Sequence, residues 1–72
     1  MMLNNCNYNK VRLLYDLSRI EGYLKRHAKA DAKRHGHVKC HKLCVDMEKD
    51  VEKHIKGIRM AIIELAKKGK FD

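Results

Sequence analysis

The sequence predicts an all-α protein: an antiparallel helical hairpin of two long helices that dimerises into a four-helix bundle. The chain has no proline and only four glycines among 72 residues. Lysine, leucine, isoleucine and alanine are abundant, and these residues tolerate or favour helix. Apolar residues also recur every seven positions in two stretches that meet at "HGH", residues 35–37. We expect one domain over residues 1–72, because a chain this short forms a single small core.

The first helix is predicted over about residues 9–35. Asn7 or Asn9 is suited to cap its start, and Gly36 is suited to the left-handed conformation that ends many helices. Heptad spacing places two lines of residues toward the second helix. One line holds Leu17, Leu24 and Asp31, and the other holds Leu13, Ile20 and His27.

The second helix is predicted over about residues 38–68, after a turn at 36–37, with Gly69 as its stop. One of its heptad lines holds His37, Cys44, Val51, Ile58 and Leu65, and the other holds Cys40, Met47, His54 and Ala61. Two long helices joined by so short a turn must lie antiparallel. No role is assigned to His54 or to the isolated Cys6.

Further apolar residues lie off these lines. A two-helix monomer buries one face of each helix, so a second apolar stripe indicates a partner, most simply a second copy of the chain. We therefore expect a homodimer, with an interface that draws on Tyr8, Val11, Tyr15, Met60 and Ile63.

Histidines and cysteines gather around the turn in "RHGHVKCHKLC", residues 34–44. Imidazole and thiolate are the ligands of zinc, and helical residues three or four apart share a face. A site for zinc or another transition metal is therefore predicted from His27, Asp31, His37, Cys40, His41 and Cys44. Two alternatives stay open: the cysteines are small apolar residues between the helices, or they are reactive thiols activated by nearby positive charge.

Positive charge is concentrated in the same segment. The chain carries a net charge of +8, and much of it falls between residues 25 and 42. The basic residues there are Lys25, Arg26, Lys29, Lys33, Arg34, Lys39 and Lys42. They form an alternative site, for the phosphate backbone of RNA or DNA. No aromatic residue lies among them to stack on bases, so such binding would not read sequence.

The short stretch "RIEG", Arg19 to Gly22, resembles the start of the all-helical copper- and nickel-responsive repressor family. That resemblance implies metal and nucleic-acid binding together. It covers four of 72 residues, and the downstream cysteine and histidine spacing departs from the pattern of the family, so no assignment follows.

No phosphate loop, nucleophile–base pair or inward-facing Glu-x-x-His pair is present, so we expect no enzyme activity. A signal-peptide core and an apolar run of bilayer length are also missing, which predicts a cytoplasmic protein without membrane contact. A structural protein that binds no ligand is the remaining alternative.

Overall fold

The computed structural model describes residues 4–72, and within them every regular element is helical. The elements are α1 (Asn5–Tyr23), a π-helical segment η1 (Leu24–Ala28), α2 (Lys29–Arg34) and α3 (Val38–Lys67). The backbone stays helical at Leu24 and Ala28, so α1, η1 and α2 form one continuous helix, called here the first helix. The prediction of an all-helical protein with two long helices is confirmed.

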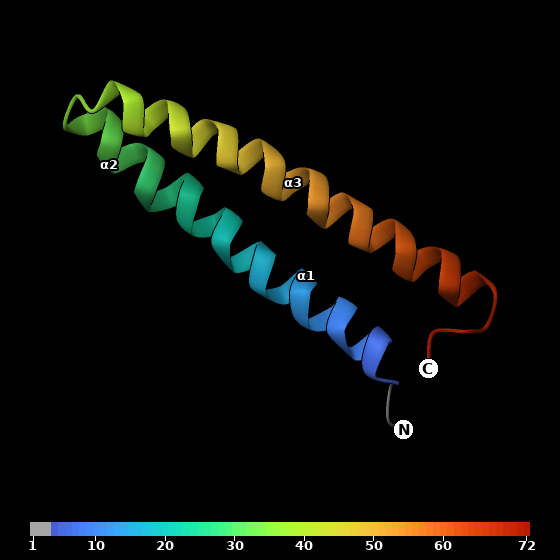
Figure 1. Ribbon diagram of the computed structural model, residues 1–72. Coiled ribbons are helices and arrows are strands. Elements are labelled where there is room, and N and C mark those ends of the chain that lie inside the picture. The colour runs from blue at the N-terminus through green and yellow to red at the C-terminus, as the bar shows by residue number, and fades with distance from the viewer. Residues whose placement is uncertain (1–3) are drawn as a thin grey trace.

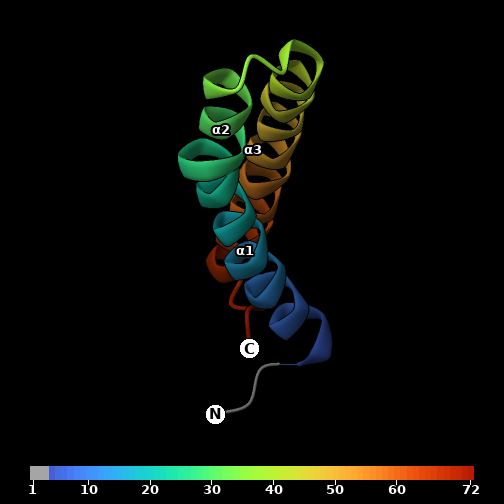
Figure 2. The same ribbon diagram turned by 90° about the vertical axis from the view of Figure 1, so that its left-hand side faces the viewer.

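The two helices lie side by side along their length and run in opposite directions (Figure 1). Turned by 90°, they still overlap closely, and the chain forms a thin rod (Figure 2). Its extents are 49 × 18 × 14 Å. The turn between the helices spans residues 35–37, where Gly36 has φ 70°, and Gly69 ends α3 with φ 68°. Glycine adopts this left-handed conformation without steric cost, as the sequence indicated.

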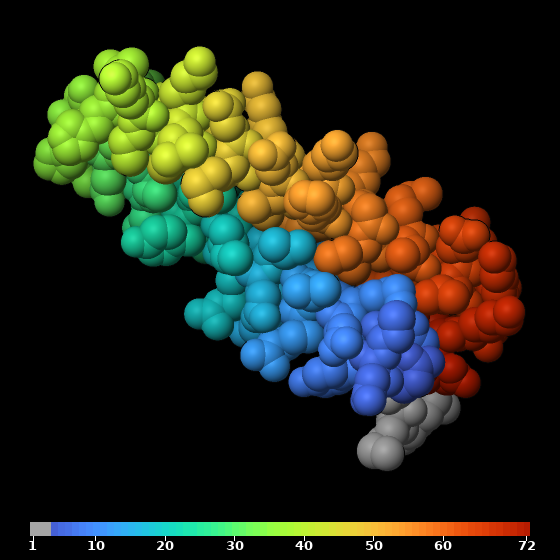
Figure 3. Space-filling model, viewed as in Figure 1, coloured from blue at the N-terminus to red at the C-terminus, as the bar shows by residue number. Residues whose placement is uncertain are grey.

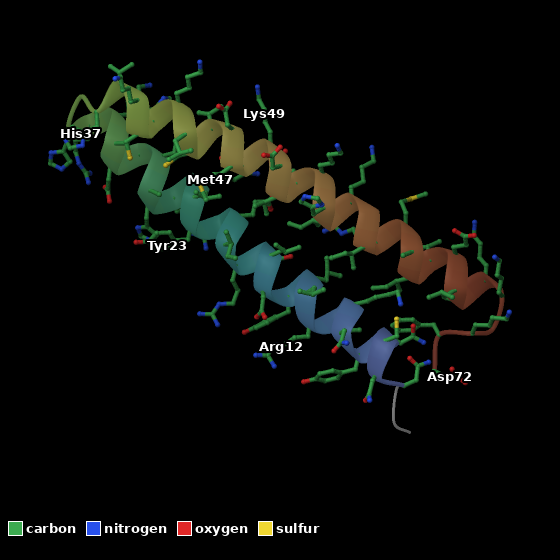
Figure 4. The ribbon with its side chains drawn as sticks, in the orientation of Figure 1. Arg12, Tyr23, His37, Met47, Lys49 and Asp72 are labelled. Atoms are coloured by element: carbon green, nitrogen blue, oxygen red, sulfur yellow. The ribbon has the colours of Figure 1, made fainter. Side chains whose placement is uncertain are left out.

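The first helix begins earlier than predicted. Asn4, not Asn7 or Asn9, is its cap, and the Asn4 side chain accepts a hydrogen bond of 2.8 Å from the Asn7 backbone N–H. Asn7 is buried and has a different task. Its side-chain amide donates to the carbonyls of Lys70 and Asp72, at 3.0 and 3.1 Å. The C-terminal tail is thereby fastened to the start of α1, at the end of the rod that holds Asp72 in Figure 4.

The face that each helix turns toward the other, called here the seam, is thin. Among the described residues, the buried apolar side chains are those of Leu24, Ala32, Cys44 and Ile55. The line of residues 44, 51, 58 and 65 lies in the seam as predicted, with Cys44 buried and the others half-buried. A seam of this size leaves most apolar side chains of the rod at its surface.

The second predicted line of α3 is displaced by one residue. Ile55 is buried in the seam, whereas its neighbour His54 is exposed and Met47 is 43% exposed. The first helix shows the same displacement, because Leu14 is half-buried while Leu13 and Ile20 are exposed. Two helices that contact only each other can place one line of side chains at the centre and must leave the adjacent line at the edge.

The π-helical segment explains why Asp31 is not in the seam. A π-helical turn holds an extra residue, and this rotates everything after it by about 100° relative to an uninterrupted α-helix. Ala32, only 5% exposed, therefore takes the inward position that heptad counting gave to Asp31. Asp31 is exposed and pairs with Arg34 on its own helix.

Candidate functional site

The two cysteines near the turn lie one helical turn apart on α3. Cys44 is buried at the seam and Cys40 is exposed. Burial raises the pKa of the Cys44 thiol, and the charge and hydrogen bonding of neighbouring Cys40 raise it further. The two sulfurs are thus close enough to interact. An activated thiol has a lowered pKa, whereas the pKa of Cys44 is raised.

The other predicted metal ligands point elsewhere. His27 is exposed, and its ring lies 5.2 Å from the ring of Tyr23, one turn away. His37 lies in the turn, with its ring 6.1 Å from that of His35 (Figure 4). Asp31 is engaged by Arg34, and His41 is half-buried on the seam side of α3.

Residues 4–72 contain no group of three or more His, Cys, Asp or Glu side chains arranged to hold a metal ion. The predicted set of six is therefore not assembled within one chain. What remains is the Cys40–Cys44 pair, which offers half of the four ligands that structural zinc takes. The extra residue of the π-helix rotates Asp31 out of the seam, and heptad counting had no means of detecting it.

Three of the predicted nucleic-acid-binding cations are neutralised within the chain. The Nζ atom of Lys25 lies 3.2 Å from Oε1 of Glu52, and Nζ of Lys29 lies 3.1 Å from Oε1 of Glu48. Arg34 pairs with Asp31. The first two pairs cross between the helices and close one side of the seam. The hydrogen bond to Glu52 and the nearby negative charge of Glu21 raise the pKa of Lys25.

The remaining four predicted cations are exposed and have no ion pair within the part of the chain described here. They are Arg26, Lys33, Lys39 and Lys42. The basic turn end therefore carries unneutralised charge, but on fewer residues than the sequence indicated. The positive charge continues along α3, where Lys49 points away from the first helix (Figure 4).

The side of the seam opposite the ion pairs is open and mainly apolar, with Asp16 and Arg19 also among its lining residues. A shallow groove of about 770 Å³ runs there between Ile20, Tyr23 and Leu24 of the first helix and Cys44 and Met47 of α3. A second hollow continues the same side toward the other end of the rod, between Leu13 and Leu17 and residues Ile58 and Ala61, and it is also lined by Lys10, Lys53 and His54. We call this side the open groove. Its rim residues Leu13, Ile20, Tyr23 and Met47 are between 43% and 62% exposed.

The interface residues predicted from the sequence are also exposed, but they do not form one surface. Tyr15 lies about 160° around the first helix from half-buried Leu17, and Met60 lies about 140° around α3 from Ile55. Tyr8, Val11 and Tyr15 thus lie on the outer face of one helix, and Met60 and Ile63 lie on the outer side of the other. A single flat partner cannot cover both outer faces, whereas the open groove draws on both helices at once.

From the sequence, the acidic run Asp46, Glu48, Asp50 and Glu52 is expected to be a solvated band that pairs with lysines and arginines of the first helix. Glu48 does pair with Lys29 of the first helix, but it lies in the seam and not in a solvated band. Its carboxylate is largely buried, and the Oε1 atom accepts no hydrogen bond despite lying 3.1 Å from the Lys29 ammonium. The signal was the acidic run 46–52, which alternates along the chain and so places some acids inward. Asn7 was considered only as a helix cap, and no local pattern reveals its bonds to residues more than sixty positions away.

Comparison with known proteins finds no family model, no curated protein and no solved structure that matches this chain. The resemblance of "RIEG" to the repressor family gains no support. None of the helices within residues 4–72 has the length and apolarity needed to cross a bilayer.

Proposed function

We propose that the protein is a non-enzymatic interaction module that works as a homodimer, in which two helical hairpins pack through their open grooves into a four-helix bundle. The observation that carries this proposal is the open groove itself, an apolar side built from both helices along the rod. The opposite side is closed by the Lys25–Glu52 and Lys29–Glu48 ion pairs, so it offers charge and not apolar area.

The exposed area supports a second copy as the occupant. A compact protein of 8.5 kDa exposes about 4,700 Å², from the usual scaling of area with mass. This chain exposes 5901 Å². The surplus of about 1,200 Å² exceeds the roughly 800 Å² that each partner buries in a stable interface of standard size. An identical groove on a second copy is mainly apolar along the same length, so a two-fold dimer matches apolar area with apolar area.

Sedimentation at micromolar concentration tests the proposal. The wild-type chain should sediment as a dimer, and the groove variant, Ile20→Lys with Met47→Lys, should be a monomer that keeps its helical circular dichroism. Both positions are more than 40% exposed in the single chain, so a lysine there leaves the seam intact. The matched control is Tyr15→Lys with Met60→Lys, which adds the same charge on the outer faces and should leave the dimer unchanged.

Salt separates this association from a charge-driven one. Each chain carries +8, so bringing two copies together is opposed by repulsion, and salt screens that repulsion. Dimerisation should therefore strengthen as sodium chloride rises from 50 to 500 mM. A wild-type monomer at 100 µM, or a control variant that dissociates while the groove variant does not, would refute the groove as the interface.

A further inference from the structure

The cations of the two helices differ in whether they form ion pairs. On the first helix, Lys25 and Lys29 reach across to glutamates of α3, and Arg34 pairs locally. Glu48 and Glu52, the acids of α3 nearest to the seam, are used in these pairs. The lysines on the outer face of α3 form no ion pair within residues 4–72, and all are exposed. We call them the lysine ridge: Lys39, Lys42, Lys49, Lys53 and Lys56.

The lysine ridge is one surface, because its members are three, four or seven residues apart. From Lys39 to Lys56 the helix rises about 26 Å. Lys53 lies about 180° around α3 from buried Cys44, and Lys49 visibly points away from the first helix (Figure 4). In the space-filling view, separate side chains project from α3 along the edge of the rod that faces away from α1 (Figure 3). The ridge is therefore a row of separate charges along one edge of the molecule.

The ridge brings like charges together. Lys39 and Lys42, and Lys53 and Lys56, are three residues apart, and Lys49 and Lys53 are four apart, so each pair repels within the helix. Asp46 lies among them and offsets one charge, but it lies beyond ion-pair distance of every lysine in the described chain. A polyanion bound along the ridge would relieve this repulsion.

We propose that the lysine ridge binds the phosphate backbone of nucleic acid without reading its sequence. A phosphate backbone presents a regular row of negative charges, which matches a row of lysines on one helical edge better than a single acidic group does. Lysine acts as a point charge, and no aromatic residue lies on the ridge to stack on bases. A membrane surface is disfavoured, because the ridge holds no continuous apolar stripe to enter the lipid; the exposed apolar residues Val38 and Met60 lie only at its two ends.

The ridge and the open groove share one residue, Lys53, which also lines the second hollow of the groove. The other four ridge lysines do not line the groove. A second copy in the groove leaves Lys39, Lys42, Lys49 and Lys56 of each chain free. Binding to phosphate therefore does not require dimerisation, and the groove variant should keep the salt dependence of the wild type for each chain.

The test is fluorescence anisotropy with a labelled 20-base-pair DNA duplex and the same duplex in RNA, at 50 and 200 mM sodium chloride. If each of the five lysines neutralises one phosphate, the logarithmic salt slope is about −4.5 and affinity falls about 500-fold over this range. The variant K42Q with K49Q and K56Q keeps two ridge lysines, so its slope should shrink to about −1.8, a fall of about 12-fold.

The matched control is R12Q with K25Q and K68Q. It removes the same three charges, but from cations that are ion-paired to Asp16, Glu52 and Glu64. Its slope should stay within about one of the wild-type value. If both triple variants lose the same affinity for the duplexes, only the net charge of the protein matters. This result would refute the proposal that the lysine ridge is the binding surface. So would the lack of binding at 50 mM salt, or tighter ridge-dependent binding to phosphatidylserine vesicles or polyglutamate than to the duplexes.

Discussion

Replacing Ile55 by alanine tests the position of the seam. The side chain is 6% exposed and lies where heptad counting had placed His54. Truncation to alanine removes three carbon atoms, which at about 0.8 kcal/mol each costs about 2.4 kcal/mol before any cavity is counted. The side chains around the truncated residue can relax toward the open groove, so the cavity adds little to this cost. We expect the free energy of unfolding to fall by about 2–3 kcal/mol.

The assay is urea denaturation followed by circular dichroism, at several protein concentrations. The seam lies within one chain, so the cost of Ile55→Ala should not depend on concentration. Met47→Ala removes a side chain of similar size at the rim of the open groove, where it is 43% exposed. Its cost should be small at dilutions that favour monomer and larger where the chain dimerises. If Met47→Ala costs more than Ile55→Ala at every concentration, the seam follows the line predicted from the sequence and the structural assignment is refuted.

Four other tests probe polar groups of the seam and of its ends. Asn7→Ala should cost about 1–3 kcal/mol and make the C-terminal tail protease-sensitive, because it removes two hydrogen bonds from a buried amide; a resistant tail would contradict this. Lys29→Met with Glu48→Leu should be neutral or stabilising in urea, because removing both charges of a largely buried pair also removes their desolvation cost; a loss above 1 kcal/mol would show that the pair stabilises the fold. The raised pKa of Cys44 lowers its thiolate fraction at pH 8, so its alkylation should be slower than that of a free cysteine peptide and should accelerate at higher pH than the peptide does. Zinc should protect neither Cys40 nor Cys44 in the monomeric groove variant, since two thiols are half of a tetrahedral site; protection there would restore the predicted one-chain site.

The helices, the turn and the end of α3 could be predicted from the sequence because local chemistry determines them. Gly36 and Gly69 adopt the left-handed conformation that few other residues tolerate, and the lack of proline leaves both helices uninterrupted. The π-helical segment could not be predicted, because nothing in "LKRHA" favours an extra residue in the turn. The contact of Asn7 with the tail joins opposite ends of the chain, and local patterns carry no information on it.

The predicted ligand set failed to assemble for a related reason. A metal site needs its ligands placed to within fractions of an ångström, and heptad counting locates a side chain only to within about 100° around its helix. The extra residue of the π-helix therefore suffices to move Asp31 from the seam to the surface. The basic residues were easier to locate as a group. The sequence also predicts that acids of residues 46–52 pair with cations of the first helix, but it does not give the individual partners. Lys25 pairs with Glu52, and Lys29 pairs with Glu48. These partners depend on the register in which the two helices pack against each other.

The displaced lines of the seam also bear on the proposed dimer. Heptad counting chose Leu13 and Ile20 on the first helix and Met47 on α3. Ile20 and Met47 are more apolar than their neighbours Glu21 and Glu48, and Leu13 continues the line of Ile20 although its neighbour Leu14 is equally apolar. The single chain leaves all three exposed at the open groove. A helix in a four-helix bundle contacts two neighbours and so needs two adjacent apolar lines, whereas a helix in an isolated pair needs one. The apolar pattern of this sequence thus holds one line more than a monomer uses, and under the proposed dimer that extra line is the one that the second copy buries.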